Sequence, residues 1–338
     1  MKNHTIHLFI FITLLEGCRN PQQENAVKTS DTSIKYQLVK DWPQFPIGFK
    51  LGNPTGIGID MHQNIFVFHR AGRIWPLVMP MPKSLITKKT ILMLDKQTGK
   101  ILNSWGAGLF IMPHGLSVDQ NDNIWVTDVG LHQVFKFSHE GKLLMKLGEA
   151  YVAGNDPLHF NRPTDVAIAY DGSFYVSDGY GNSRIIKFSA SGKYLLEWGK
   201  KGSHPGEFNI PHALCLDEKG YVYVADRENR RVQVFDSSGK FIKQWKSKSF
   251  GNICSVTFDK IKNSFVAVDD VTTFKLIHQG SDIILFDSTG NILTQFGRSG
   301  LYDGPVCWYH DAAIDKDKSI YVGDILGNRI QKFQKVDR

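Results

Sequence analysis

The chain has 338 residues, of which 42% are hydrophobic, 12% aromatic and 22% charged. This composition is typical of a protein that buries a sizeable core, and it excludes an intrinsically disordered or collagen-like chain. The 40 basic and 33 acidic residues give a net charge of +7 without any block of five or six Lys or Arg, so the sequence predicts no nucleic-acid partner.

The N-terminus has the pattern of an export signal. Lys2 precedes an apolar run from Ile6 to Leu15, which has the length of a signal-peptide core and is too short to span a bilayer. The run ends in Leu-Glu-Gly-Cys18, which resembles a bacterial lipobox apart from its Glu. We therefore expect an exported protein.

Residues 1–18 are accordingly predicted to be a lipoprotein-type signal peptide, with Cys18 as the lipid-carrying residue that anchors the protein to a bacterial membrane. Residues 19–35 are polar and poor in aromatic side chains, as a tether would be. An ordinary cleaved signal peptide, with Cys18 incidental, is the alternative. The other cysteines, Cys215, Cys254 and Cys307, show no metal-binding CxxC spacing and are expected to be buried thiols.

From Pro54 onward the sequence is a repeat. Each unit has an apolar strand, a turn, a second strand that ends in Asp, a polar loop, and two further strands separated by a Gly turn. Four regular units begin at Pro113, Pro163, Pro211 and Tyr309. Two looser units begin at Pro54 and Cys254, and each carries an insertion; the first insertion covers residues 70–89.

Six units of four strands predict an all-β fold, a six-bladed β-propeller over residues 36–338. The last unit reaches only three strands before the chain ends, so we expect the segment Tyr36 to Trp42 to supply its outer strand and close the ring. The strand and loop pattern resembles the NHL class of repeats, which defines an architecture and leaves the activity open.

Three histidines occupy one position of the repeat, at the start of the innermost strand of units two, four and six. They are His114, His212 and His310, separated by 98 residues in each step. With 12 histidines in the chain, chance filling of two further chosen positions has a probability on the order of 10⁻³. Alternate blades stand 120° apart in a six-fold ring, so the three imidazoles are predicted to converge on the axis. Three His ligands with an open fourth position are typical of catalytic zinc.

Three more residues lie on loops at the same end of the channel. Arg70 follows the second strand of unit one, Tyr180 follows that of unit three, and Arg227 follows that of unit four. A guanidinium offers a fixed cation for a carboxylate, and a Tyr beside a metal and an Arg is expected to ionise more readily than an isolated one.

A specific resemblance rests on segments that contain these residues. They are 68–75 (FHRAGRIW), 112–119 (MPHGLSVD), 125–135 (WVTDVGLHQVF), 163–167 (PTDVA), 176–185 (VSDGYGNSRI), 211–214 (PHAL), 224–229 (VADREN) and His310-Asp311. These segments are similar to the peptidyl-α-hydroxyglycine α-amidating lyase family, and the similarity runs from about Pro54 to Phe333.

The resemblance implies a role for each matching residue. Zinc ligands fall on the three channel histidines, catalytic residues on Tyr180 and Arg70, and substrate-side arginines on Arg70 and Arg227. A structural calcium would bind the backbone carbonyls of Ile57 and Leu116 and the carboxylate of Asp311, which suits the preference of hard cations for oxygen. The animal enzymes carry a disulfide at the positions of Asn161 and Gly181, so this chain lacks it.

The implied reaction cleaves a carbon–nitrogen bond: R-CO-NH-CH(OH)-COO⁻ gives R-CO-NH₂ and glyoxylate. We expect a monomer that acts on peptides or small molecules with an α-hydroxyglycine end. Two alternatives remain open. One is a calcium-dependent propeller lactonase or hydrolase, in which oxygen ligands would dominate the channel. The other is a non-catalytic exported propeller that binds peptide or glycan, in which the channel histidines would be dispensable.

Overall fold

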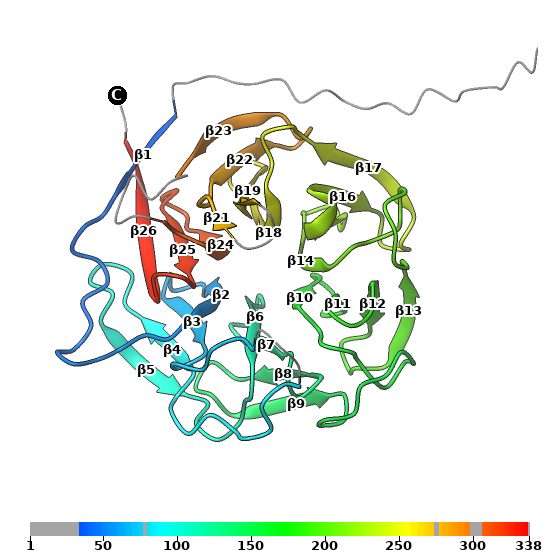
Figure 1. The fold of residues 1–338 in the computed structure, drawn as a ribbon, viewed down its shortest axis with the longest axis horizontal. Helices are drawn as coiled ribbons and strands as arrows, with labels where there is room; N and C mark the ends of the chain where they lie inside the picture. Colours follow the sequence, from blue (N-terminus) through cyan, green and yellow to red (C-terminus); the bar gives the residue numbers. More distant parts are fainter. Residues whose placement is uncertain (1–33, 77–79, 274–276, 298–305, 337–338) are drawn as a thin grey trace, which may run out of the picture.

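A closed ring of sheets forms the body of the protein (Figure 1). The computed structural model describes residues 34–76, 80–273, 277–297 and 306–336. Within them the chain forms six four-stranded antiparallel sheets around a central axis, which confirms the predicted six-bladed β-propeller. The predicted signal peptide, Cys18 and nearly all of the tether lie outside these residues. The described part contains no helix long and apolar enough to cross a membrane.

The blades follow one another around the ring, each running from the axis outward in chain order. Blade 1 contains β2 (Pro54–Ile59), β3 (Ile65–His69), β4 (Ile91–Leu94) and β5 (Ile101–Trp105). Blade 2 contains β6 (Pro113–Val118), β7 (Ile124–Asp128), β8 (Gln133–Phe137) and β9 (Leu143–Leu147). Blade 3 contains β10 (Asp165–Ile168), β11 (Phe174–Asp178), β12 (Arg184–Phe188) and β13 (Tyr194–Trp198).

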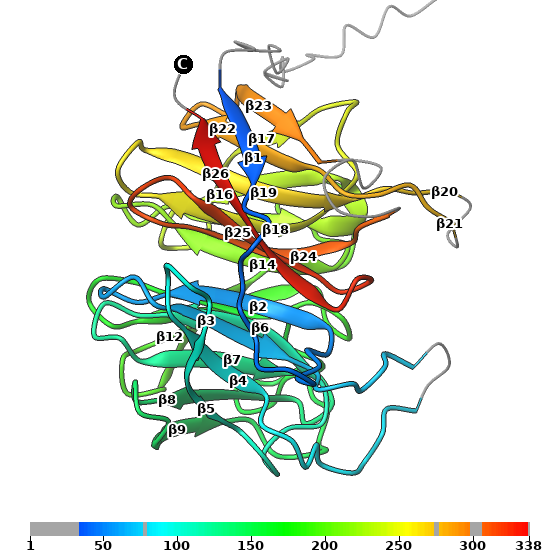
Figure 2. The same cartoon turned by 90° about the vertical axis from the view of Figure 1, so that its left-hand side faces the viewer.

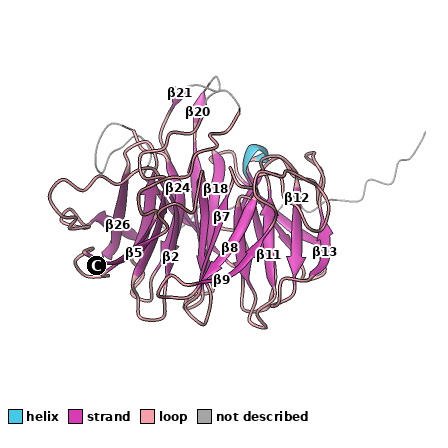
Figure 3. Ribbon diagram, turned by 90° about the horizontal axis from the view of Figure 1, so that it is seen from below, coloured by secondary structure: helices cyan, strands magenta, loops and turns pink. Residues whose placement is uncertain are grey.

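Blades 4 to 6 repeat this order. Blade 4 contains β14 (Pro211–Leu216), β15 (Val222–Asp226), β16 (Arg231–Phe235) and β17 (Phe241–Lys246). Blade 5 contains β18 (Asn252–Asp259), β19 (Ser264–Asp270), β22 (Ile283–Asp287) and β23 (Ile292–Phe296). Blade 6 contains β24 (Tyr309–Ile314), β25 (Ile320–Asp324) and β26 (Arg329–Val336), with β1 (Lys35–Leu38) as its outer strand. The short elements η1 (Arg227–Asn229), β20 (Thr272–Thr273) and β21 (Ile277–His278) lie at one end of the ring (Figure 3).

The hydrophobic core lies between neighbouring blades. The second strand β7 is buried along its whole length because blades cover both of its faces, whereas the outer strand β9 is largely accessible. One buried cluster joins Phe66 and Phe68 of blade 1 to Val126 and Phe135 of blade 2. Because each blade buries its faces only against its neighbours, the stability of the fold depends on the complete ring.

The two ends of the chain close the ring. Strand β1 pairs antiparallel with β26, with Lys35 opposite Val336 and Leu38 opposite Phe333 (Figure 2). The expected closing segment is therefore the right one, although the strand begins one residue earlier and ends four residues sooner. Pairing of the termini covers the edge that an open repeat array would expose.

The three cysteines within the described residues are free thiols. Cys254 and Cys307 are buried as expected, and Cys215 is half-buried.

In blades 2 to 6 an Asp at or next to the end of the second strand holds the loop that leads into its own blade. Asp128 accepts hydrogen bonds from the amides of Ile111 and Met112, at 2.8 Å each. The equivalent carboxylates in the later blades do the same: Asp178 for Asn161, Asp226 for Asn209, Asp269 for Gly251 and Asp324 for Trp308.

Blade 1 has His69 at this position instead of Asp. Its Nδ1 accepts from the amides of Gly52, at 3.4 Å, and Ala71, at 3.1 Å. An imidazole nitrogen that accepts hydrogen bonds carries no proton, so the histidine does the work of the repeat's Asp as a neutral group.

Tryptophans of the outer strands contact Gly turns of the following blade. Trp198 in β13 lies against Gly239, between β16 and β17, and Trp245 in β17 lies against Gly290 in the same way. Gly239 has φ +84°, and a Cβ there would lie 2.7 Å from the Trp198 ring. Glycine is therefore required at this turn both for the backbone conformation and for the approach of the ring.

Replacement of Gly239 by Ala should lower stability by about 2–4 kcal/mol, since it combines an unfavourable positive φ with overpacking against Trp198. Gly220→Ala is the matched control, because Gly220 also has a positive φ, +79°, but nothing lies within 4 Å of its Cβ position. We expect Gly220→Ala to lower the free energy of unfolding only through the unfavourable positive φ, without the part due to overpacking. Equal midpoints of thermal unfolding for the two variants would contradict the role of the tryptophan contact.

A second prediction concerns acid sensitivity. Burial, with a smaller contribution from Lys88, lowers the pKa of His69 from 6.5 to about 4. The unfolded chain thus takes up a proton near pH 6.5, whereas the folded chain resists it until about pH 4. The contribution of His69 to the free energy of unfolding is fully present above pH 6.5. It decreases as the pH falls, by about 2 kcal/mol between pH 7 and pH 5.

His69→Asn keeps an acceptor for the two amides but does not titrate. Urea unfolding at pH 7 and pH 5 should show a smaller loss of stability for this variant than for the wild type. The same loss in both proteins would mean that His69 does not control this part of the pH dependence.

Candidate metal centre and active site

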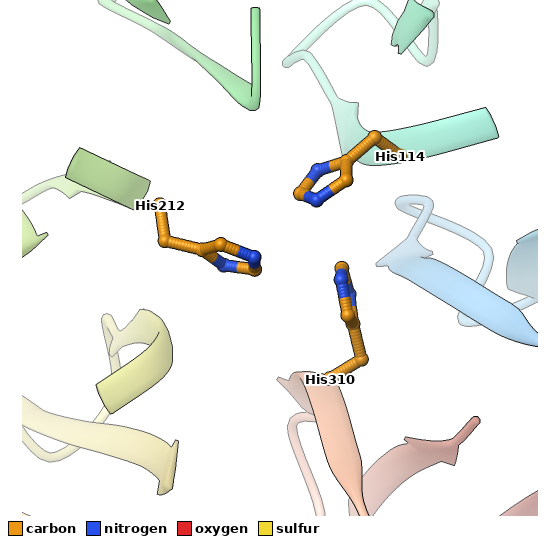
Figure 4. Close-up of side chains that lie close together, drawn as sticks. All are labelled: His114, His212 and His310. Carbon is orange, nitrogen blue, oxygen red and sulfur yellow. The ribbon is translucent and has the colours of Figure 1, made fainter. Parts of the chain in front are cut away.

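Three histidine side chains meet on the axis of the ring (Figure 4). His114 comes from β6, His212 from β14 and His310 from β24, the innermost strands of blades 2, 4 and 6. The centroids of their rings are 4.6–4.8 Å apart, and their candidate ligand atoms all lie within 4.8 Å of one another. The structure thus brings together the residues that the 98-residue spacing selects.

A local irregularity accompanies each histidine. The pairing of the innermost strand with the second strand shifts register at Pro113/Leu116, at Pro211/Ala213 and at Tyr309/Asp311. Each shift includes the histidine position. Bulges of this kind change the direction of a side chain, and here the affected side chains point to the axis.

Each imidazole is fixed by a hydrogen bond to an intervening blade. Nδ1 of His114 lies 2.7 Å from the carbonyl oxygen of Thr164, Nδ1 of His212 lies 2.6 Å from that of Cys254, and Nδ1 of His310 lies 2.8 Å from that of Thr55. A carbonyl oxygen only accepts, so each Nδ1 donates a proton and each Nε2 keeps its lone pair. These acceptors could not be predicted from the sequence, because a backbone oxygen has no residue-type signature.

The three histidines are neutral in this environment. Burial lowers the pKa of His310 to about 3, and burial together with the neighbouring histidines lowers the pKa of His114 and His212 well below 6.5. Neutral imidazoles with a fixed tautomer and an unprotonated Nε2 are the form that binds a metal ion. Three nitrogen donors on one point suit zinc or a related transition metal.

The hydroxyl of Tyr180 lies beside two of these ligand atoms, 3.1 Å from Nε2 of His114 and 3.0 Å from Nε2 of His212. Arg227, the first residue of η1, donates to the same oxygen from Nη1 at 3.3 Å. Burial nevertheless raises the pKa of Tyr180, and the positive charges of Arg227 and Arg70 only oppose this effect. The two arginines alone do not produce the easier ionisation that the sequence suggested.

Arg70 is a buried cation, with a side chain that is 3% exposed. Its Nε donates to the carbonyl of Pro113 at 3.2 Å, next to His114. Within the described residues no acidic side chain lies in ion-pair range of its guanidinium. Burial lowers its pKa to about 10, so it remains charged at neutral pH. A buried guanidinium beside the histidines, with no ion-pair partner among the described residues, is a candidate site for an anionic group.

The residues expected to hold calcium are neighbours in the channel. The amide of Ile57 donates to Asp311 Oδ2 at 2.7 Å, and a Cβ on Gly56 would lie 2.6 Å from the backbone nitrogen of Leu116. Ser255 donates to the other carboxylate oxygen of Asp311 at 2.5 Å. The structure thus places the three expected residues at one level of the channel.

Asp165 adds a second carboxylate that the sequence analysis did not assign. It belongs to blade 3, opposite blade 6 across the ring (Figure 1), and its Oδ2 accepts from the amide of Leu214 at 3.1 Å. Burial raises the pKa of Asp311 to about 7, and burial together with the charge of Asp311 raises the pKa of Asp165 well above its usual range. Two such carboxylates fit a channel that holds a divalent cation.

Asn161 and Gly181 face each other beside Tyr180. The amide of Gly181 donates to the carbonyl of Asn161 at 2.9 Å, and a Cβ on Gly181 would lie 2.1 Å from Cγ of Asn161. The two positions are thus adjacent, as the family disulfide implies. In this chain the asparagine side chain fills the space and hydrogen bonds hold the loop.

Comparisons with known proteins agree with this architecture. Residues 110–137, 160–188 and 208–235 match the NHL repeat family. The chain is 36% identical over 330 residues to peptidyl-glycine alpha-amidating monooxygenase B of Xenopus laevis, covering 92% of this chain and 37% of that protein. It is 35% identical over 328 residues to peptidyl-alpha-hydroxyglycine alpha-amidating lyase 1 of Drosophila melanogaster, and the match covers 88% of this chain and 59% of that protein.

Among solved structures, a gluconolactonase from Xanthomonas campestris aligns over 94% of this chain and 97% of its own, with a TM-score of 0.61 and 11% identity. Identity this low shows a shared fold alone. The chain spans about a third of the length of the Xenopus protein. The identity with the amidating proteins extends over nearly all of the present sequence, and the repeats and the six blades agree with it. The chain belongs to the NHL-repeat family of peptidyl-α-hydroxyglycine α-amidating lyase domains.

Proposed function

We propose that this protein is a zinc-dependent lyase that cleaves a peptidyl- or acyl-α-hydroxyglycine to an amide and glyoxylate. One observation carries the proposal: three neutral Nε2 atoms, a tyrosine hydroxyl and a buried guanidinium that pairs with no described acidic side chain lie together at the channel axis. These groups match the hydroxyl and the carboxylate that this substrate places on a single carbon.

The arginines account for recognition of the carboxylate. Arg70 offers its terminal nitrogens as donors, and a charge-assisted pair with a carboxylate would compensate its buried charge. Arg227 is already engaged by Glu228 at 3.1 Å and by the Tyr180 hydroxyl. We therefore assign the substrate carboxylate to Arg70 and the support of Tyr180 to Arg227.

Tyr180 is the group placed to move the proton. Cleavage transfers the hydroxyl proton of the substrate to the leaving amide nitrogen, while the C–N electron pair goes to that nitrogen and the carbon becomes an aldehyde. The phenol of Tyr180 donates its proton to the leaving nitrogen, and the phenolate so formed takes the hydroxyl proton of the substrate, so that Tyr180 ends as a phenol and no net proton is lost. The hydrogen bond from Arg227 stabilises negative charge on the phenol oxygen during this exchange.

The donor set fits the proposed metal ions. A zinc ion held by Nε2 of His114, His212 and His310 would supply Lewis-acid polarisation of the substrate oxygen atoms. A calcium ion at Ile57, Leu116 and Asp311 would offset the two channel carboxylates and so stabilise the ring, without taking part in the reaction.

His212→Ala should abolish zinc binding and lower the conversion of α-hydroxyhippurate to benzamide and glyoxylate at least about a hundred-fold. Metal analysis of the purified protein and a glyoxylate assay measure the two effects. His139→Ala is the matched control, because His139 contacts Asp60 at 2.9 Å in an ion pair away from the channel. Zinc-loaded wild type that is no more active than His212→Ala would sink the proposal.

Calcium should raise the unfolding temperature of the wild type, and Asp311→Asn should remove most of this increase while leaving the zinc content unchanged. At a calcium concentration a hundred times the dissociation constant, the expected stabilisation is about 2.7 kcal/mol. In a chelator the variant should be at least as stable as the wild type, because it relieves the repulsion with Asp165. Asp317→Asn, at an exposed acid of the same blade, is the control. An unchanged calcium response in Asp311→Asn would exclude this site.

A further inference from the structure

The insertion of blade 1 brings an extra aromatic ring to the site. The connections between second and third strands in blades 2, 3, 4 and 6 are short, whereas residues 70–89 separate β3 from the start of the β4 region. This insertion extends from the same end of the ring as β20 and β21 (Figure 2). Its described residues include Trp75, which is half-buried and packs on the cluster between blades 1 and 2.

Hydrogen bonds hold the insertion together across Trp75 and tie its later half to the ring. Nη1 of Arg73 donates to the carbonyl of Ser84 at 2.9 Å, across the insertion. The amide of Ile86 donates to the carbonyl of Phe110 at 2.8 Å, and the hydroxyl of Tyr151 donates to the carbonyl of Lys83 at 3.2 Å. These contacts join the insertion to the loops that lead into blades 2 and 3, so the ring of Trp75 has a defined position.

Trp75 contacts three members of the site. The guanidinium carbon of Arg70 lies 5.0 Å from the centroid of its ring, in the range of a cation–π contact. The ring of Tyr180 is 5.0 Å away and that of His114 is 6.5 Å away. The tryptophan thus lies against the cation, the phenol and one of the candidate metal ligands.

The arginines that begin the third strands of blades 3, 4 and 6 are stabilised differently. Arg184, Arg231 and Arg329 each donate from Nε to the Asp at the end of their own second strand, at 3.1, 2.6 and 2.8 Å. A carboxylate partner neutralises the guanidinium and occupies its donors. An aromatic face attracts the cation but accepts no strong hydrogen bond, so the donors remain available.

We propose that Trp75 is a positioning residue that holds Arg70, a cation with no ion-pair partner among the described residues, toward the histidines and ready to bind the carboxylate of a ligand. The inference deepens the proposed function, because the carboxylate concerned is that of α-hydroxyglycine. It also gives the insertion a role: in blade 1 the position of the repeat's Asp is taken by the neutral His69, and the insertion brings a tryptophan to Arg70.

The test compares two unreactive ligands that differ in charge. Hippurate carries the carboxylate, and hippuramide carries an uncharged amide in its place. Affinities are measured by calorimetry on the metal-loaded protein. We expect Trp75→Leu to weaken hippurate binding about ten- to thirty-fold and hippuramide binding less than about three-fold, since the cation–π contact of a desolvated arginine is lost. Trp75→Phe should restore most of the preference for hippurate.

Trp105→Leu is the matched control. Trp105 packs on the same cluster from the outer strand β5, so its loss should lower the unfolding temperature without changing the ratio of the two affinities. An equal loss of both ligands in Trp75→Leu, or no rescue by Phe, would overturn the inference. So would a wild type that binds hippurate no better than hippuramide. Failure of the wild type to cleave α-hydroxyhippurate would instead contradict the proposed function, and the hippurate ratio would still decide the role of Trp75.

Discussion

Three hydrogen bonds from histidine Nδ1 atoms to backbone carbonyls connect the fold to the site. Each bond crosses from one blade to another, so the position of every candidate metal ligand depends on the packing of neighbouring blades. The carbonyls of Thr55, Thr164 and Cys254 fix both the orientation and the tautomer of the imidazoles. A ring that opened or slipped would separate the nitrogens. Closure by β1 and β26 is therefore a requirement for the site as well as for stability.

The buried charges of the molecule have two kinds of surroundings. Arginines that hold the blades together are paired with the aspartates that end the second strands, such as Arg231 with Asp226. The charges around the axis are not compensated in this manner. Arg70 lies against an aromatic ring, and Asp165 and Asp311 face one channel level with raised pKa values. Such an arrangement is unfavourable in an empty channel and becomes favourable when ligands of opposite charge bind.

Blade 1 is the place where the repeat departs most from its pattern, and the departures coincide with the site. His69 replaces the Asp of the other blades and keeps the same amide contacts as a neutral group. The insertion that follows carries Arg70 and Trp75 to the channel. The same segment of sequence thus interrupts the structural rule of the repeat and supplies two of the groups that the proposed reaction needs.

The repeat pattern was enough to predict the architecture and the convergence of the three histidines on the axis. Recurrent Asp and Gly at fixed spacing define six units, and a side chain repeated at every second unit must converge in a six-fold ring. The hydrogen-bond acceptors of the histidines and the contacts between blades became visible only in the folded chain. The carbonyl acceptors are invisible in a sequence because every residue has one. The partnership of Asp165 with Asp311, the contact of Trp75 with Arg70 and the raised pKa of Tyr180 all depend on distances between blades and on burial, which no local pattern encodes.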